Sequence, residues 1–470
     1  MGIKPVYWRL RPTERRLILI IGDLGASSVS LLVSLYFWAQ KDAWLDFSFI
    51  FLTDRTPIWY YLLPVVWIIL LVELYDTRRA SRIRDTIMGI AVAALISFGL
   101  YLVVYFTAEP SSLPRRGVAF FIAFTSLLTF FWRMLYIKIF TAPEFMRRVL
   151  VVGAGRAGSS FAKIVHDFWP PPFFMVGFID DSPEKIGEDI EDYPVLGGCH
   201  NMLDIVQQEN VTDLVFAISG EMSSEMFQTL ILAEEQGIEI TTMPIMYEEL
   251  LGRVPILLLR SDWILRSFVD QIHAGEFFEF AKRMIDIICG IIGATILVFL
   301  SPFIAIATFL DSGRPILYLQ NRLGKNGRVY TIIKFRTMRQ DAEKDGKARP
   351  AVENDERVTR VGRLLRKSHL DEFPQFINVI KGEMSMIGPR AERLELVKDL
   401  QAKVPFYRAR LLVKPGLTGW AQINYGYAST ADETAIKLEY DLYYIKHRNL
   451  MLDFRILFST MGAVIGLRGQ

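Results

Sequence analysis

Long apolar runs dominate the first third of the chain. Four of them lie near residues 17–39, 59–75, 86–107 and 117–140, and more polar stretches separate them. Most are long enough to cross about 30 Å of hydrocarbon as helices, whereas the second run contains Pro64 and is of marginal length. The pattern predicts a four-span transmembrane region over residues 1–145.

The pattern then changes to short apolar runs that are typical of buried strands. The segment RRVLVVGAGRAGSSFAKIVHDF places a strand before a Gly-rich turn and a helix after it, and the strand-like run MVGFIDD ends in Asp180 and Asp181. Further strand and helix alternation follows in VTDLVFAIS and IEITTMPI. We therefore expect an α/β Rossmann-like domain over residues 146–250 and a linker over residues 251–275.

Nucleotide binding by this domain is left open by its sequence. Gly153, Gly155 and Gly158 would let a pyrophosphate approach the N-terminus of the helix, with Asp180 nearby. However, no Tyr-x-x-x-Lys or other hydride-transfer signature follows, so NAD is not expected as a cofactor.

A fifth apolar segment spans residues 284–310 and is interrupted by Ser301 and Pro302. Proline removes a backbone hydrogen bond and bends a helix. Basic residues flank both sides of the segment, which favours a re-entrant hairpin that enters and leaves by the cytoplasmic face. The alternative is a straight fifth span with a proline kink.

Composition and charge agree with a membrane protein. Apolar residues make up 51% of the chain, and the net charge is +2. Basic residues cluster before the first span and after the second and fourth spans, which predicts that both ends of the membrane region lie in the cytoplasm. We interpret the first run as a retained span, because it lacks a small-residue cleavage site. The basic clusters comprise Lys4, Arg9, Arg11, Arg15, Arg16, Arg78, Arg79, Arg82, Arg84, Arg147 and Arg148.

Two further features of the composition narrow the chemistry. Cys199 and Cys289 are far apart and form no CxxC motif, so neither a structural disulfide nor a zinc site is expected. Residues 314–367 carry fifteen Lys or Arg against six Asp or Glu. Such a segment suits phosphates, lipid headgroups or nucleic acid.

An adjacent pair of carboxylates lies in the segment SHLDEFPQFINV, where Asp371 precedes Glu372. The structural explanation is helix capping, because acidic residues favour helix N-termini and Pro374 suits a first turn. The functional explanation is that a cation or a substrate offsets the repulsion between the two carboxylates.

Four polar motifs follow the fifth apolar segment in a fixed order. They are YLQNRLGKNGRVYTIIKFRTM (318–338), ERVTRVGRLLRKSHLDEFPQFINVIKGEMSMIGPR (356–390), KPGLTGWAQINY (414–425) and KLEYDLYYIKHRNLMLDF (437–454). Together they resemble the bacterial sugar transferase domain of the monotopic phosphoglycosyl transferases, an α+β domain with a re-entrant membrane helix, here over residues 276–470. With the preceding spans and the Rossmann-like domain, the whole chain resembles the large polyprenyl-phosphate hexose-1-phosphate transferases.

This resemblance implies an activity, partners and a location. The family transfers a sugar 1-phosphate from a UDP-sugar to undecaprenyl phosphate and releases UMP, which begins the assembly of exopolysaccharide, capsule or O-antigen glycans. The implied partners are the UDP-sugar, the lipid phosphate, the bilayer and downstream glycosyltransferases, with no nucleic acid. The implied location is the bacterial inner membrane, with a multi-pass chain and a catalytic domain that faces the cytoplasm. Homo-oligomerisation and the identity of the sugar stay open.

The resemblance also implies roles for particular residues. Asp371 would be the nucleophile that forms a covalent phospho-sugar intermediate, and Asp371 and Glu372 would hold Mg²⁺ or Mn²⁺. Asp453 would be a further acidic active-site residue. The expected groups that bind phosphate or nucleotide are Lys334, Arg336, Arg366, Pro389 and Arg390.

The chain departs from the family pattern at two positions. Ala391 stands where many members have a second proline after Gly-Pro-Arg, and Gly426 stands where many have an arginine. Another arginine must therefore supply the missing phosphate donor, or the substrate must differ.

Two other classes of protein are compatible with parts of the sequence. One is a membrane-anchored, NAD-dependent nucleotide-sugar epimerase or dehydratase, and the other is a non-catalytic membrane sensor with a nucleotide-binding module. Both leave the C-terminal motifs unexplained.

Overall fold

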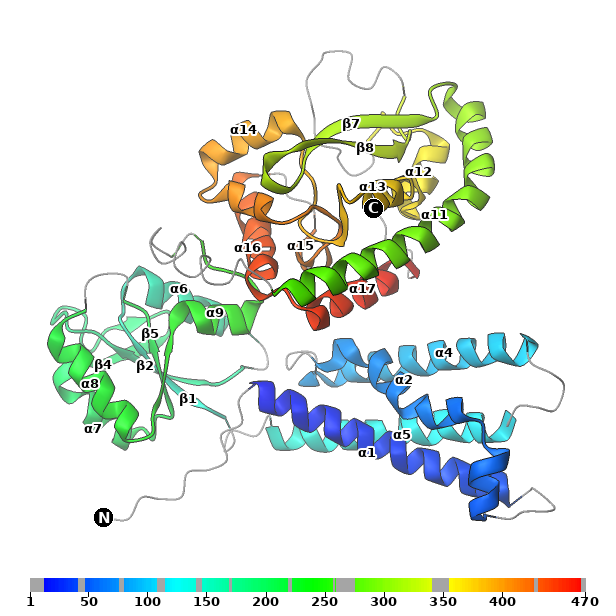
Figure 1. Cartoon of the computed structure of the whole chain (residues 1–470). Helices are drawn as coiled ribbons and strands as arrows, with labels where there is room; N and C mark the ends of the chain where they lie inside the picture. The colour runs from blue at the N-terminus through cyan, green and yellow to red at the C-terminus, as the bar shows by residue number, and fades with distance from the viewer. Residues whose placement is uncertain are drawn as a thin grey trace. The chain divides into compact units, whose positions relative to one another are not determined.

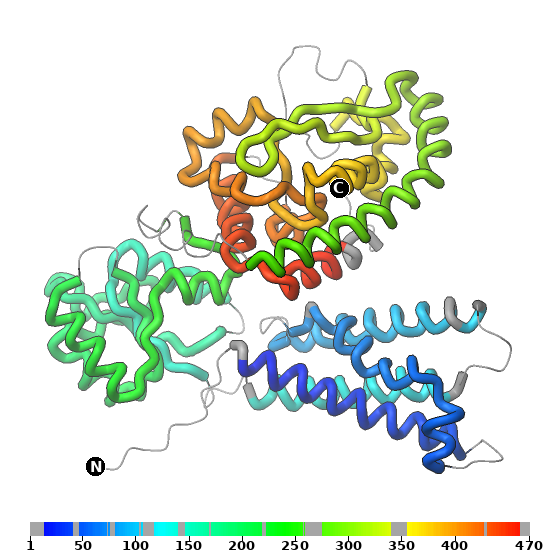
Figure 2. The backbone as a smooth tube through the Cα atoms, viewed as in Figure 1, coloured from blue at the N-terminus to red at the C-terminus, as the bar shows by residue number. Residues whose placement is uncertain are grey.

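The computed structural model divides into two compact units, Met1–Thr241 and Thr242–Gln470 (Figures 1 and 2). The residues that it describes are 12–40, 47–75, 80–107, 115–140, 146–168, 171–218, 222–256, 258, 275–339, 355–426 and 430–465.

Three long apolar helices form most of the described membrane region. They are α1 (Pro12–Ala39), α4 (Ile83–Thr107) and α5 (Arg115–Phe140). Each is long and apolar enough to cross a membrane, and many of its large apolar side chains are exposed, as a lipid-facing surface requires. Lys4, Arg9, Arg11, Arg78 and Arg79 lie outside the described residues, so the orientation of the spans stays a prediction.

The expected second span, over residues 59–75, is not one continuous helix. It consists of a 3-10 helix (Ile58–Leu62), helix α2 (Leu63–Leu70) and a second 3-10 helix (Val72–Tyr75). Pro64 lies in the first turn of α2, where its missing N–H is tolerated, so the proline starts a helix instead of continuing one. The apolar helical stretch Ile58–Leu70 is shorter than a full span usually requires, in line with the marginal length expected for this run. A fourth span at this position stays a prediction.

A buried ion pair joins α1 to α5, and sequence analysis did not anticipate it. Arg133 Nη2 donates to Asp23 Oδ2 over 2.6 Å, and both side chains are fully buried. Arg133 Nη1 also donates to the carbonyl oxygen of Leu74 over 2.8 Å. Because an isolated charge is costly inside a membrane region, this pairing fixes how the two helices pack.

The predicted Rossmann-like domain is present as a six-stranded sheet with the order β3-β4-β2-β1-β5-β6. Its parallel centre pairs β1 with β2 and β5, and β2 with β4. The strands are β1 (Arg148–Val152), β2 (Phe174–Ile179), β3 (Asp189–Ile190), β4 (Tyr193–Gly197), β5 (Asp213–Phe216) and β6 (Glu239–Thr242). The connecting helices are α6 (Arg156–His166), α7 (Met202–Gln208) and α8 (Ser224–Glu235).

The Gly-rich turn between β1 and α6 has the backbone geometry that its glycines predict. Gly153 has φ = 107°, a value that favours glycine. A Cβ atom on Gly158 would lie 2.0 Å from the carbonyl oxygen of Gly153, so only glycine allows the helix to approach the turn this closely.

The second unit begins earlier than the boundary expected at residue 250. Helix α9 (Met243–Leu251) contributes Tyr247, which donates to Glu439 over 3.0 Å, and Glu248, which accepts from Lys446 over 2.8 Å. Both partners lie on α16 (Ala431–His447), so these polar contacts attach α9 to the C-terminal unit. Most of the expected linker lies outside the described residues.

The rest of the second unit is an α+β domain, as predicted. An antiparallel hairpin, a short parallel strand pair and several helices surround one main apolar cluster. The strands are β7 (Leu317–Leu323), β8 (Val329–Phe335), β9 (Ser385–Ile387) and β10 (Gly416–Thr418). The helices after β8 are α12 (Arg360–Lys367), α13 (Gln375–Lys381), α14 (Leu394–Lys403), α15 (Trp420–Asn424), α16 and α17 (Leu450–Ile465).

The fifth apolar segment forms the 37-residue helix α11 (Glu276–Ser312), with Pro302 inside it. Ser301 Oγ donates to the carbonyl oxygen of Val298 over 3.3 Å, within the turn before the proline. Figure 1 shows that the helix changes direction along its length. Large apolar side chains are exposed along much of it, including Phe299 and Phe303.

Candidate active site

Asp371 and Glu372 lie in a 3-10 turn (Leu370–Glu372) between α12 and α13. His369, just before them, has φ = 56°, an uncommon conformation for a residue other than glycine. Helix α13 begins at Gln375, and no side-chain hydrogen bond caps it. The pair therefore lies near the N-terminus of α13 without capping it through a side-chain hydrogen bond.

Glu372 is held by two cations from distant parts of the chain. Its Oε1 accepts from Lys334 Nζ over 2.7 Å and from Arg390 Nη2 over 2.6 Å. Lys334 lies on β8, and Arg390 follows β9. Burial alone would raise the pKa of Glu372. The positive charges of Arg390 and Lys334 have a larger effect and hold this pKa well below its ordinary value. Glu372 is thus ionised and fixed in place at neutral pH.

Asp371 has a different environment, although it is the next residue. Its side chain is buried, with 9% of the residue exposed, and it makes no hydrogen bond to the described part of the chain. Burial and the negative charge of Glu372 raise its pKa to about 6, against the opposing charges of Lys334, Arg366 and Arg390. Asp371 is therefore ionised at neutral pH but more basic than an ordinary carboxylate. No donor of the described residues forms a hydrogen bond with it.

The remaining predicted phosphate-binding residues have different surroundings. Arg366 Nε donates to Thr337 Oγ1 over 2.9 Å, and its charge acts on Asp371. Arg336 is buried, and its Nη2 donates to the carbonyl oxygens of Ser312 and Gly313 over 2.6 and 2.7 Å. Arg336 therefore binds the C-terminal end of α11, and in the described structure it makes no contact with the carboxylate pair.

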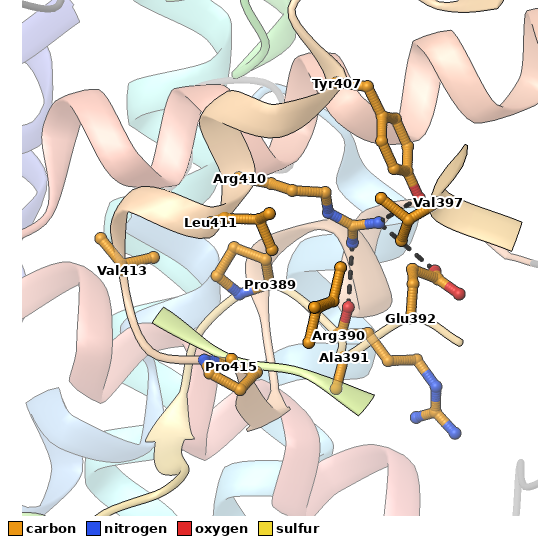
Figure 3. A pocket seen from close by; sticks show the side chains of 12 residues that line it. Pro389, Arg390, Ala391, Glu392, Val397, Tyr407, Arg410, Leu411, Val413 and Pro415 are labelled. Carbon is orange, nitrogen blue, oxygen red and sulfur yellow. Dashed lines mark hydrogen bonds and ion pairs between the residues drawn. The ribbon is translucent and has the colours of Figure 1, made fainter. Parts of the chain in front are cut away.

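A buried network around Arg410 supports the loop that carries Pro389 and Arg390, and sequence analysis missed it (Figure 3). Arg410 Nη2 donates to the carbonyl oxygen of Arg390 over 3.0 Å and to Asp441 Oδ2 over 2.7 Å. Arg410 Nη1 donates to the Tyr407 hydroxyl over 2.8 Å. Tyr407, Arg410 and Arg390 also line a small cavity, and the hydrogen bond from Arg410 fixes the backbone at Arg390.

Asp453 makes no contact with Asp371 or Glu372 among the described residues and has partners of its own. Its carboxylate accepts from Lys282 Nζ over 2.7 Å and from the Tyr444 hydroxyl over 2.8 Å. This ion pair connects α17 to the N-terminal part of α11.

A divalent cation fits the carboxylate pair by the chemistry of its donors. The described residues contain no group of three or more His, Cys, Asp or Glu side chains that could hold a metal. However, Mg²⁺ usually takes one or two carboxylates and completes its shell with water and substrate phosphates. Both oxygens of Asp371 and the Oε2 of Glu372 have no hydrogen-bond partner in the described structure, so they are available for this purpose.

The carboxylate of Asp180, next to the Gly-rich turn of the Rossmann-like domain, accepts hydrogen bonds from its own chain. Asp180 Oδ2 accepts from the Ala154 amide over 2.8 Å and from Lys185 Nζ over 3.1 Å, and Oδ1 accepts from the Ser182 amide over 3.0 Å. Although burial raises the pKa of Asp180, these hydrogen bonds lower it below the ordinary value. The carboxylate thus stabilises the turn itself.

Comparison with known proteins gives separate matches for two parts of the chain. A family model described as "Bacterial sugar transferase" matches residues 277–466, and one described as "CoA-binding domain" matches residues 70–244. The UDP-glucose:undecaprenyl-phosphate glucose-1-phosphate transferase of Xanthomonas campestris pv. campestris is 30% identical over 335 residues, which are 68% of this chain and 67% of the relative. The chain belongs to the bacterial sugar transferase family, as its motifs predicted.

Two other relatives match over shorter stretches. The UDP-N-acetylgalactosamine-undecaprenyl-phosphate N-acetylgalactosaminephosphotransferase of Aeromonas hydrophila is 42% identical over 218 residues, 46% of this chain and 50% of the relative. The UDP-glucose:undecaprenyl-phosphate glucose-1-phosphate transferase of Escherichia coli (strain K12) is 40% identical over 185 residues, 38% of this chain and 39% of the relative. The matched stretches thus span from 39% to 67% of these three relatives.

Proposed function

We propose that this chain transfers a sugar 1-phosphate from a UDP-sugar to undecaprenyl phosphate and releases UMP, as the first membrane step in the assembly of a glycan. The observation that carries the proposal is the environment of Asp371. This carboxylate is buried without a hydrogen-bond partner, while its neighbour Glu372 is ionised and held by Lys334 and Arg390.

In the proposed mechanism, Asp371 attacks the phosphorus atom that bears the sugar. A bond forms between a carboxylate oxygen and phosphorus, and the bond to the bridging oxygen breaks, so UMP leaves with the electron pair. An oxygen of the lipid phosphate then attacks the same phosphorus and displaces Asp371. The raised pKa favours the first step, because a more basic carboxylate is a better nucleophile.

The cations around the pair have a clear role in this reaction. A carboxylate that approaches a diphosphate meets like charge, and Lys334, Arg366 and Arg390 offset that repulsion. Mg²⁺ or Mn²⁺ at Asp371 and Glu372 would add Lewis-acid charge stabilisation when bound. We expect a chelator to remove activity, and full activity in EDTA would exclude the metal.

A re-entrant arrangement of α11 suits the same function. Both ends of the helix bind one polar domain, through Lys282 with Asp453 at one end and Ser312 with Arg336 at the other. A straight span would place these ends on opposite sides of the membrane. Cysteines introduced at Glu279 and Asp311 should therefore both be labelled from the cytoplasmic side alone, and labelling from opposite sides would contradict the proposal.

The deciding experiment uses the purified full chain in lipid nanodiscs that contain undecaprenyl phosphate. It is incubated with a panel of UDP-sugars, including UDP-glucose and UDP-N-acetylgalactosamine, and UMP release is followed. We expect release with at least one sugar and transfer of that sugar phosphate to lipid. If no sugar gives UMP and an NAD-dependent absorbance change appears instead, the epimerase alternative is correct.

A further inference from the structure

A second small cavity adjoins the groups that hold Glu372. Four polar side chains line it, and each comes from a different part of the domain. They are Arg322 on β7, Lys334 on β8, Gln375 at the start of α13 and Arg390 after β9. The other lining residues are Ile332, Met384, Ala391, Gly416 and Leu417.

Gln375 is one of the buried polar residues of this domain that lack a hydrogen-bond partner. It is 2% exposed, and its Nε2 is completely buried without a hydrogen-bond partner. Asn378, one turn later, is also fully buried but donates to the carbonyl oxygen of Thr331 over 2.8 Å and to Glu383 over 2.7 Å. A buried amide without partners destabilises a protein, so a position that keeps one calls for a ligand that satisfies it.

Arg322 adds a second unsatisfied donor to the same cavity. Its Nη1 donates to the carbonyl oxygen of Ala391 over 3.1 Å, while its Nε is buried without a partner. The lining therefore includes three cationic side chains and no carboxylate. Glu372 offsets two of these charges from outside the lining, and it does so through one oxygen.

We propose that this cavity binds a phosphoryl group of a substrate, with Gln375 Nε2 and Arg322 Nε as donors beside Lys334 and Arg390. The proposal rests on the proposed function and assigns two residues to substrate binding that the motifs did not. Arg322 also supplies the phosphate donor that is missing at Gly426. The phosphoryl group comes either from the nucleotide diphosphate or from the lipid phosphate.

The test is to replace Gln375 with methionine, which has a similar shape but no donor. Binding of UDP and of undecaprenyl phosphate is measured separately by titration of the full chain in nanodiscs. We expect about tenfold weaker binding of one of the two, since a lost hydrogen bond to a charged group has an effect of this size. The ligand affected identifies the source of the phosphoryl group.

Gln320→Met is the matched control. Gln320 has a buried Oε1 without a partner but does not line the cavity, so this variant should bind both ligands as the wild type does. A second variant, Gln375→Glu, introduces a carboxylate beside three cations. We expect it to raise the melting temperature in the absence of ligand and to weaken ligand binding by more than tenfold, because the new charge repels phosphate.

Two outcomes contradict the proposal. One is unchanged affinity of Gln375→Met for both ligands, and the other is a loss of thermal stability in both Gln375 variants without a ligand-specific effect, as a purely structural role predicts. These outcomes are separate from failure of the proposed function. If the wild type binds UDP but releases no UMP from any UDP-sugar, the function is wrong while the binding site stands.

Discussion

Two aspartates of this chain lie in or near motifs that are associated with phosphate ligands, and their hydrogen bonding and pKa differ in opposite directions. Asp180, beside the Gly-rich turn of the Rossmann-like domain, accepts hydrogen bonds at both oxygens from its own chain, and its pKa is lowered. Asp371, in the C-terminal unit, has no hydrogen-bond partner among the described residues, and its pKa is raised to about 6.

The difference shows how a stabilising carboxylate is distinguished from a reactive one. A carboxylate that its own fold satisfies lowers the free energy of the native state and has little capacity left for a ligand. A buried carboxylate that the fold leaves unsatisfied destabilises the native state, and such positions are found where a protein acts on a substrate. The motif alone does not separate these two cases.

The largest expected effect is on turnover when Asp371 becomes asparagine. We expect Asp371→Asn to reduce UMP release by more than about 10³-fold, because the amide cannot form the covalent intermediate. Asp399→Asn, at an exposed position on α14, should retain full activity. Near wild-type turnover in Asp371→Asn would show that Asp371 is not the nucleophile.

A smaller loss is expected at the neighbouring carboxylate. Glu372→Gln should reduce turnover by about 10²-fold, because it removes the anion that fixes Lys334 and Arg390. It also removes a negative charge beside Asp371, so the acidic limb of the pH profile should move to lower pH. Glu395→Gln, at an exposed position, is the control. If the acidic limb did not move, the charge of Glu372 would have no effect on the pKa of Asp371.

Stability should change in the opposite direction to activity in Asp371→Asn. The pKa of Asp371 is raised in the folded state, so its stabilising contribution is complete below its unfolded value near 4 and is lost as pH rises through about 6. At pH 7.5 the asparagine variant should therefore be more stable than the wild type by about 3 kcal/mol. At pH 4 the difference should largely disappear. Thermal unfolding at the two pH values measures this, and equal melting temperatures at pH 7.5 would contradict it.

The smallest expected effect is at the Gly-rich turn. Asp180→Asn should lower the stability of the Rossmann-like domain by about 1–2 kcal/mol, because the Ala154 amide and Lys185 lose an ionised acceptor. UMP release should stay within twofold of wild type. Hydrogen exchange over residues 148–179 measures the first effect, with Asp204→Asn as the exposed control. A selective loss of activity would instead assign a catalytic function to this turn.

Much of the fold was predictable from local patterns. The strand, Gly-rich turn and helix around Gly153 were expected from an apolar run, three spaced glycines and a helical pattern, and the structure shows the close contact that Gly158 allows. The long apolar helices α1, α4 and α5 were expected from length and composition alone. Pro64 marked the second run as marginal, but the sequence did not show that the run would divide into two 3-10 helices and the short helix α2.

The site was predictable in part. The motifs identified Lys334, Glu372 and Arg390, and the structure brings these three together although they lie up to 56 positions apart. Sequence could not show that Arg336 binds the end of α11, because a basic motif does not specify which anion or carbonyl each side chain reaches. Gln375 gave no signal either, since a glutamine at a helix start is usually solvated.

The buried pair of Asp23 and Arg133 has a consequence for biosynthesis. The two residues are 110 positions apart, so Arg133 is synthesised well after Asp23. At about 5–20 residues per second, the delay is roughly 5–20 s. During that time α1 carries an acidic group without its partner, and release of this helix into lipid is unfavourable. Membrane insertion of this chain should therefore retain α1 near the translocation channel until α5 arrives, which makes assembly of the membrane region an ordered process.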